Sequence, residues 1–293
     1  MRNFEVLFDH TEGVAIEDPA LEGYGRLSFP VPPVDRPWIY SNFVQSLDGI
    51  VSLRGKDGSG FHISQSEDDR WLMDALRANA DAILLGINTL VEERYYMGPQ
   101  GRGPVFKIAG SELLKLRDKL GRGRQKNIFV TSSARIQLQE FRVFDGEFVD
   151  AYVVTTSTGA NLLRAQKHPK VTIIEAGEWP RIDLKLAINK IHRELGVGYL
   201  LCEGGPTLYG YMARAGLIDE KFVTVAPVEV GQMAPSEQEM AAFDKTRARP
   251  TTFAGPGFTR ETMSRWAWLS CRRVGDHEFN RYRKKELIVG VKG

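Results

Sequence analysis

Glycines that follow an apolar run make the strongest candidate site for binding a phosphate. Residues 199–203 are apolar until they end in Glu203, and Gly204, Gly205 and Pro206 come next. A strand that passes through glycines into a helix exposes unpaired backbone N–H groups, and the helix dipole adds to their attraction for anions. Pro206 suits the first helical position, where an N–H has no partner. The pattern therefore indicates an anion site, although an ordinary glycine-rich turn would have the same shape.

A second glycine turn follows the apolar run at 81–85. Gly86 ends that run, and Thr89 with Glu92 has the spacing of a capping box, which predicts that Thr89 caps a helix. Two such turns in one sheet would suit the pyrophosphate of a dinucleotide. The patterns G-x-G-x-x-G after a strand and G-x-x-x-x-G-K-[ST] are both missing, so a standard Rossmann site or P-loop is not supported.

Glu203, Arg77 and Glu93 are the candidates for the chemical step. Glu203 ends a strand with a buried pattern, at the edge where α/β sheets bind their ligands. Arg77 has two interpretations. Its guanidinium is suited to binding a phosphate or carbonyl, and the alternative is a structural cation near a helix C-terminus. The capping role is open to Glu92, which leaves Glu93 freer to act on a ligand. Surface charge is the alternative for both glutamates.

The composition is that of an ordinary soluble globular protein. The chain has 293 residues, of which 42% are hydrophobic and 26% charged, and its formal net charge of +2 favours neither a nucleic-acid nor a membrane surface. Two cysteines cannot build a disulfide framework or a zinc cluster, and five histidines show no paired spacing, so we expect no metal. Without an apolar run long enough for a membrane span or a secretory leader, the cytoplasm is the expected location.

Short apolar runs alternate with helical patterns from residue 38 onward, which indicates an α/β domain. This order predicts a mainly parallel sheet with antiparallel strands added late. We expect strands at 38–44, 81–85, 127–131, 151–155, 171–175, 199–203 and 221–226, and two more at 265–272 and 278–283. The clearest helical patterns are at 65–78, 183–195 and 206–215.

Prolines set the first part of the chain apart. Four of them precede Pro37, and the stretch 29–33 cannot form a regular helix or a central strand. We expect residues 1–37 to form an N-terminal extension or arm, and residues 38–285 to form one domain. Within it, residues 231–262 have the composition of a loop or insertion, and residues 286–293 form a tail.

The motifs in combination resemble the dihydrofolate-reductase-like fold. Within that fold they resemble the reductase of riboflavin biosynthesis, the C-terminal domain of the bifunctional deaminase-reductase. The chain lacks the zinc-deaminase signature of the other half. The resemblance covers roughly residues 38–285, and its pieces occur in the family's order. They are Ser46-Leu47-Asp48-Gly49, His62-Ile63-Ser64, the string at 76–89, Glu203-Gly204-Gly205-Pro206-Thr207-Leu208 and Phe279-Asn280-Arg281-Tyr282-Arg283.

The resemblance implies a three-layer α/β fold, a homodimer and NADPH-dependent reduction of a phosphorylated ribosylaminopyrimidine. A hydride would pass to the ribose C1′ and open the sugar to a ribityl chain. Glu93 and Glu203 are the implied catalytic residues. The residues implied to bind the substrate are Ser46, Asp48, Arg77 and Tyr96. Those implied to bind the cofactor are His62, Ser64, Gly86, Thr89, Gly204, Gly205, Pro206, Thr207, Leu208 and Tyr209.

Three departures from the family pattern concern the substrate. The family often has Asp-Asp-Pro where this chain has Glu92-Glu93-Arg94, and a tryptophan where it has His62. A basic residue for the substrate phosphate aligns near Gln100, with Arg94 and Arg102 close by. Two other readings therefore stay open. One is a reductase of the same fold acting on another carbonyl, imine or pterin-like substrate. The other is an NADPH-binding sensor or scaffold without turnover.

Overall fold

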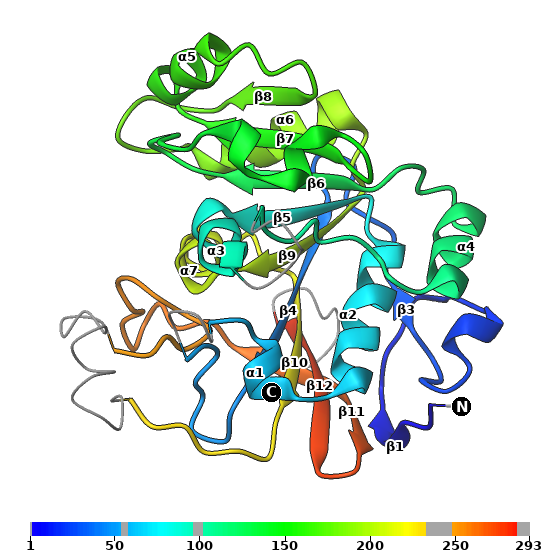
Figure 1. Ribbon diagram of the computed structural model, residues 1–293. Coiled ribbons are helices and arrows are strands. Elements are labelled where there is room, and N and C mark those ends of the chain that lie inside the picture. Colours follow the sequence, from blue (N-terminus) through cyan, green and yellow to red (C-terminus); the bar gives the residue numbers. More distant parts are fainter. Residues whose placement is uncertain (1, 54–57, 96–101, 233–247, 286–293) are drawn as a thin grey trace.

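Ten strands form one sheet in the computed structural model, which describes residues 2–53, 58–95, 102–232 and 248–285 (Figure 1). They are β1 (Glu5–Asp9), β4 (Trp38–Gln45), β5 (Ala82–Gly86), β6 (Lys126–Val130), β7 (Asp150–Thr155), β8 (Val171–Glu175), β9 (Tyr199–Gly204), β10 (Glu220–Val225), β11 (Trp266–Val274) and β12 (His277–Lys284). The order across the sheet is β1-β11-β12-β10-β4-β9-β5-β6-β7-β8. From β10 to β8 the neighbours are parallel, and β12, β11 and β1 are antiparallel. The predicted mainly parallel sheet with late antiparallel strands is confirmed.

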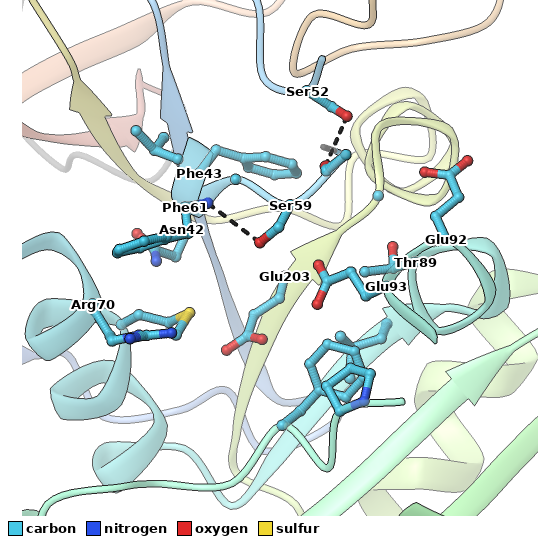
Figure 2. Close-up of a pocket in the computed structure, with 18 of the residues that line it drawn as sticks. Asn42, Phe43, Ser52, Ser59, Phe61, Arg70, Thr89, Glu92, Glu93 and Glu203 are labelled. Atoms are coloured by element: carbon cyan, nitrogen blue, oxygen red, sulfur yellow. Dashed lines mark hydrogen bonds between the residues drawn. The ribbon is translucent and has the colours of Figure 1, made fainter. Parts of the chain in front are cut away.

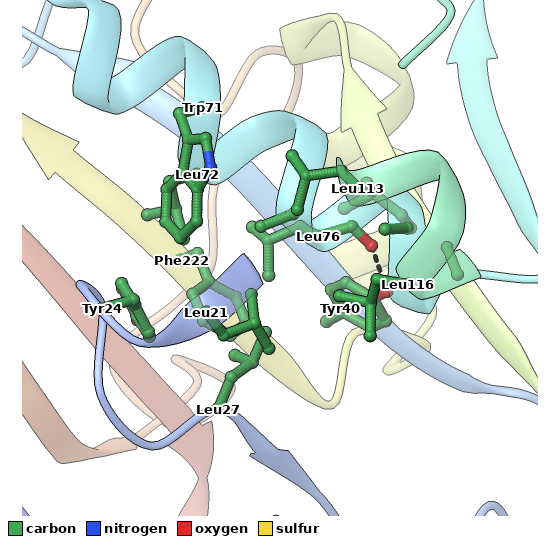
Figure 3. Packing of buried hydrophobic residues seen from close by; sticks show 14 of the residues in the cluster. Leu21, Tyr24, Leu27, Tyr40, Trp71, Leu72, Leu76, Leu113, Leu116 and Phe222 are labelled. Atoms are coloured by element: carbon green, nitrogen blue, oxygen red, sulfur yellow. Dashed lines mark hydrogen bonds between the residues drawn. The ribbon is translucent and has the colours of Figure 1, made fainter. Parts of the chain in front are cut away.

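Helices cover both faces of the parallel strands, which explains their continuous apolar runs. In β5, Ile83 and Leu85 belong to one buried cluster, and Leu84 between them belongs to another. Helices α6 (Leu184–Leu195) and α7 (Pro206–Arg214) pack in the cluster of Leu84. Helices α2 (Glu67–Asn79) and α4 (Ser111–Lys119) pack in a third cluster, together with Tyr40. There the Tyr40 hydroxyl donates to Leu76 O at 2.8 Å (Figure 3).

Two helix starts differ from the prediction. The residue that caps α2 is Ser66, whose Oγ accepts from Asp69 N, because Gln65 adopts a left-handed conformation and ends the short helix α1 (Phe61–Ser64). The prediction that Thr89 caps a helix is wrong. Helix α3 (Ile87–Glu92) starts directly after β5, with extended Gly86 at its N-cap and no side-chain cap, so Thr89 lies inside the helix.

The N-terminal segment, which we expected to form an arm, contributes to the same core. Strand β1 pairs with β11, and β2 (Val14–Ala15) pairs with β3 (Ser28–Phe29). The buried arginines of β11 and β12 hold the segment through its backbone: Arg272 donates to Tyr24 O at 2.8 Å and Arg281 donates to Ser28 O at 2.6 Å. The prolines prevent long regular elements here, yet the residues between them are buried: Leu21, Tyr24, Leu27 and Phe29.

The segment expected to be a loop or insertion contains no helix or strand where it is described, at 231–232 and 248–262. One bridge joins Thr251 to Ile50, which brings Pro250 to the end of β4. The expected tail at 286–293 lies outside the described residues. No helix in the described part of the chain is long and apolar enough to cross a membrane.

Candidate active site

A cavity of about 570 Å³ opens at the carboxyl ends of three central strands (Figure 2). Asn42 and Phe43 of β4, Leu85 of β5 and Glu203 of β9 line it. Helix α2 and residues of the segment 103–109, which has no helix or strand, form other parts of its wall. Because α/β sheets bind ligands where parallel strands end, this cavity is the candidate active site.

A buried arginine joins two carboxylates at the inner end of the cavity. Arg77 Nε donates to Glu203 Oε1 at 2.7 Å and Arg77 Nη2 donates to Glu203 Oε2 at 2.8 Å, so the pair is bidentate. Arg77 Nη1 donates to Asp74 Oδ1 at 3.2 Å, and the other oxygen of Asp74 accepts from Ala109 N at 2.9 Å. Burial alone would lower the pKa of Arg77, but the Glu203 carboxylate raises it above its ordinary value, so the guanidinium stays charged.

Glu93 lies near the Arg77–Glu203 pair, and burial shifts its pKa. It follows α3 and begins the short helix η3 (Glu93–Tyr95), and Figure 2 shows its carboxyl projecting into the cavity on the side where Glu203 does. Burial raises the pKa of Glu93 to about 7; Arg77 opposes this shift, whereas Glu203 adds to it. A carboxyl group with such a pKa can give or take a proton near neutral pH, the property required of a general acid or base.

The two glycine turns lie against each other beside the cavity. A Cβ on Gly204, where φ is +86°, would stand 2.7 Å from the Phe43 ring. A Cβ on Gly205 would stand 3.2 Å from Thr89 Oγ1, and one on Gly86 would stand 3.5 Å from Gly205 N. At Gly204 the Phe43 ring leaves no room for a side chain, whereas the distance at Gly86 is an ordinary van der Waals contact.

The start of α7 completes this corner. Gly205 is the N-cap and Pro206 the first helical residue, as the sequence pattern predicted. The first N–H groups of a helix have no partner inside it, so those of Thr207 and Leu208 are suited to an anion. Gly205, Pro206 and Thr89 all line the cavity, and their arrangement fits the phosphate of a nucleotide cofactor.

The structure brings some of the implied cofactor residues to the cavity and places others elsewhere. Leu208 and Tyr209 point into the core and are 7% and 2% exposed, which leaves only their backbone for a ligand. His62 lies half-buried beside the Phe61 ring, and neither His62 nor Ser64 is among the lining residues. Ser64 is buried, and its Oγ accepts from Ser66 N at 3.2 Å. The cofactor roles of these four residues stay predictions.

The residues expected to bind substrate also divide. Arg77 lines the cavity, whereas Ser46 and Asp48 do not. Ser46 Oγ donates to Asp48 Oδ1 at 2.6 Å, and Asp48 Oδ2 accepts from Gly231 N at 2.7 Å. These contacts belong to a turn that holds a neighbouring loop, and Asp-Gly is a common turn pair. Tyr96 lies outside the described residues.

The sequence interpretation missed several lining residues. Asp74 was identifiable in principle, because it stands three positions before Arg77 on the same helix face. Asn42 lines the cavity with a buried Oδ1 that has no hydrogen-bond partner among the described residues. Lys107 comes from a segment without helix or strand, which no pattern marks. No group of His, Cys, Asp or Glu in the described part of the chain is arranged to hold a metal ion.

Comparison with known proteins finds similarity over most of the chain. The model of the RibD C-terminal domain matches residues 37–254. The 2,5-diamino-6-ribosylamino-4(3H)-pyrimidinone 5′-phosphate reductase of Archaeoglobus fulgidus is 29% identical over 226 residues, which are 76% of this chain and 96% of that protein. The enzyme of the same name from Methanothermobacter thermautotrophicus is 29% identical over 196 residues, covering 67% and 80%.

Solved structures share the fold. A pyrimidine reductase-like protein from Corynebacterium diphtheriae superposes with a TM-score of 0.65 at 22% identity, over 90% of this chain and 98% of that one. A deaminase/5-amino-6-(5-phosphoribosylamino)uracil reductase from Thermotoga maritima superposes with a TM-score of 0.61 at 15% identity. That match covers 85% of this chain but only 57% of the Thermotoga protein. These superpositions confirm the expected α/β fold as one that the chain shares with both proteins.

Proposed function

The chain belongs to the family of the RibD C-terminal domain, and we propose that it is an NADPH-dependent reductase of a phosphorylated ribosylaminopyrimidine in riboflavin biosynthesis. The names of the two archaeal relatives support this substrate class. The observation that carries the proposal is the convergence on one cavity of Glu93, the Arg77–Glu203 pair and the glycine turn at the start of α7. The proposal includes a homodimer, which follows from the family resemblance, and the cytoplasmic location expected from the sequence.

The corner between the two glycine turns would hold the cofactor. The N–H groups at the start of α7 would bind phosphate, and Thr89 would border it from α3. When bound, the nicotinamide supplies the hydride. The chain positions that ring against the substrate and keeps the charged groups at the inner end of the cavity fixed.

Glu93 would supply the proton that the reaction needs. When the hydride reaches C1′, the bond between C1′ and the ribose ring oxygen breaks, and that oxygen must be protonated to become the hydroxyl of the ribityl chain. Glu93 is half-buried in the cavity with a pKa of about 7, so it carries a transferable proton near neutral pH. Glu203 and Arg77, locked together, would orient the substrate beside it.

The experiment that tests this function has a binding step and a turnover step. Nicotinamide fluorescence should change when NADPH is added to the purified protein, and NADPH should be oxidised once the phosphorylated ribosylaminopyrimidine is present. Glu203→Gln should slow oxidation, whereas Arg164→Gln, which affects an exposed ion pair at edge strand β8, should not. Failure to bind NADPH at millimolar concentration would exclude the proposal. Oxidation with dihydrofolate alone would favour the other same-fold reductase, and binding without any oxidation would favour a sensor.

A further inference from the structure

The inner end of the cavity is too acidic to receive a phosphate. Asp74, Glu93 and Glu203 gather there around one cation, Arg77, and both forks of its guanidinium already contact carboxylates. A phosphate dianion placed among these groups would be repelled by the carboxylates and would find no free cation among the described residues there. The substrate phosphate must therefore be bound elsewhere in the cavity.

The arginines nearest to the family's expected phosphate position are engaged away from the cavity. Arg94 Nη1 donates to Glu140 Oε2 at 2.9 Å, and Arg102 forms a bidentate pair with Asp145 at 2.8 and 2.9 Å. Neither arginine is among the residues that line the cavity. Another cation must therefore take their place.

Lys107 and Arg142 line the cavity and lie on one aromatic ring. Lys107 Nζ is 4.1 Å and Arg142 Cζ is 4.9 Å from the centre of the Phe148 ring. Lys107 is exposed and has no carboxylate partner among the described residues. Among the described residues, the carboxylate that pairs with Arg142 is the exposed one of Glu147, at 3.2 Å, and such exposed pairs are weak enough to exchange for a ligand.

The segment that carries Lys107 is fixed by buried polar side chains although it has no regular structure. Gln125 Nε2 donates to Phe106 O at 2.6 Å, and Asn127 Nδ2 donates to Val105 O at 2.8 Å. Arg77 Nη1 donates to the carbonyl of Lys107 itself at 3.3 Å, which ties the segment to the acidic end of the cavity. Gln125, Asn127 and Arg77 are all at most 6% exposed, so Lys107 is presented from a rigid backbone.

We propose that Lys107 and Arg142 bind the phosphate of the substrate and thereby select phosphorylated over unphosphorylated ribosylaminopyrimidines. The inference rests on the proposed reductase function and assigns its substrate phosphate to a second end of the same cavity. Two cations on one aromatic ring suit a phosphate dianion. Because this group is positive and the group around Arg77 is rich in carboxylates, the substrate would bind in one orientation. Arg70, which lines the cavity together with Arg77 and Arg142, stands on α2 over the Phe61 ring, and Figure 2 shows it on the side of the cavity away from Thr89.

The test compares phosphorylated and dephosphorylated substrate in single variants. Lys107→Gln and Arg142→Gln should each raise KM for the phosphorylated substrate about tenfold to a hundredfold, the loss expected for one charged hydrogen bond. Neither variant should change kcat/KM for the dephosphorylated compound or KM for NADPH. Lys115→Gln and Arg164→Gln are the controls, because Lys115 is an exposed lysine and Arg164 has an exposed glutamate partner at 3.2 Å, like Arg142.

Binding of ribose 5-phosphate, measured by calorimetry on the same proteins, separates this inference from the proposed function. If the wild type oxidises no NADPH, the reductase proposal fails, while weaker binding of this probe to both variants would still support the anion site. Equal losses with both forms of substrate would overturn the inference, because they would indicate a structural role. An effect on KM for NADPH alone would assign the two cations to the cofactor instead, and unchanged kinetics and binding would exclude them altogether.

Discussion

Glu93 and Glu203 share one cavity, yet their surroundings give them different properties. Glu203 is held by two hydrogen bonds from Arg77, which fix its carboxylate in place. No hydrogen bond of that kind holds Glu93 in the described part of the structure, and burial raises the pKa of Glu93 to about 7. One carboxyl group is thus suited to orient and the other to transfer a proton.

The pH dependence of the reaction should report Glu93. If it acts as the proton donor, kcat should fall as the pH rises through about 7, where its carboxyl loses the proton. Glu93→Gln should lower kcat by roughly a hundredfold to ten-thousandfold and remove this pH dependence. Steady-state rates between pH 5 and 9 measure both effects. A wild-type profile that stays flat across this range would contradict the assignment.

The free energy of unfolding should fall as the pH rises, because the pKa of Glu93 is higher in the folded protein than in the unfolded chain. The ordinary pKa of 4.5 applies to the unfolded chain, and the folded value is about 7. The stability that the protonated Glu93 carboxyl contributes to the folded state is therefore complete below pH 4.5 and is lost as the pH rises through 7. Denaturant unfolding should show Glu93→Gln gaining stability relative to the wild type across this window, and an opposite trend would refute the raised pKa.

At the scale of elements, the sequence predicted that both glycine turns lead into helices, but it gave the helix cap correctly at only one of them. Gly205 and Pro206 start α7 as predicted, because a strand that ends in two glycines before a proline has few other conformations. The capping-box pattern at Thr89 gave a wrong prediction, because Gly86 is the N-cap of α3 and Thr89 faces the turn at Gly205. Strands with long apolar runs were found within a residue or two. Helices α4 and α5 (Ser157–Ala165) were missed, although α7, which is also nine residues long, was found from the glycines and proline at its start.

Gly204→Ala should damage the cofactor corner. A methyl group there would lie 2.7 Å from the Phe43 ring at a φ of +86°, so the turn must move. NADPH affinity, followed by nicotinamide fluorescence, should fall about tenfold or more. Gly196→Ala is the matched control, because Gly196 also has positive φ but open space around it. Its cost of about 1–2 kcal/mol should appear in stability alone. Equal NADPH affinity in the two variants would argue against a phosphate at this turn.

The Arg77–Glu203 pair also ties helix α2 to strand β9. Their side chains are only 5% and 9% exposed, so Arg77→Ala would leave a carboxylate buried without its cation. We expect the free energy of unfolding to fall by about 3–5 kcal/mol. Arg164→Ala, which breaks an ion pair with 52% and 38% exposed side chains, should stay within about 0.5 kcal/mol of the wild type. Urea titrations measure both, and similar losses would show that burial of the pair is unimportant.

At the scale of the whole molecule, the N-terminal segment stabilises the sheet that carries the site. Its residues fill the core between the antiparallel strands and α2, and Arg272 and Arg281 bind its backbone. Sequence could not show this, because prolines interrupt the pattern between residues 19 and 37 and the partners on β11 and β12 lie more than two hundred positions away. The same limit explains why Lys107 and the polar anchors of 103–109 escaped prediction, since only the folded chain brings them together.

Leu27→Ala tests the structural role of this segment. Leu27 is fully buried, so the substitution leaves a cavity and should cost about 2–5 kcal/mol. Val34→Ala, seven positions later at 98% exposure, should change stability by less than about 0.5 kcal/mol. Thermal and chemical unfolding compare the two. A small effect at Leu27 would mean that the segment is an appendage to the domain.

The most direct measurement of the central claim follows the hydride itself. NADPH deuterated at the transferring position of the nicotinamide is incubated with the protein and the phosphorylated ribosylaminopyrimidine, and the product is analysed by NMR and mass spectrometry. The account predicts one deuterium at C1′ of a ribityl chain, and much less product with Glu93→Gln than with the wild type. Product without deuterium at C1′, or NADPH left unconsumed by a protein that binds it, would contradict the account.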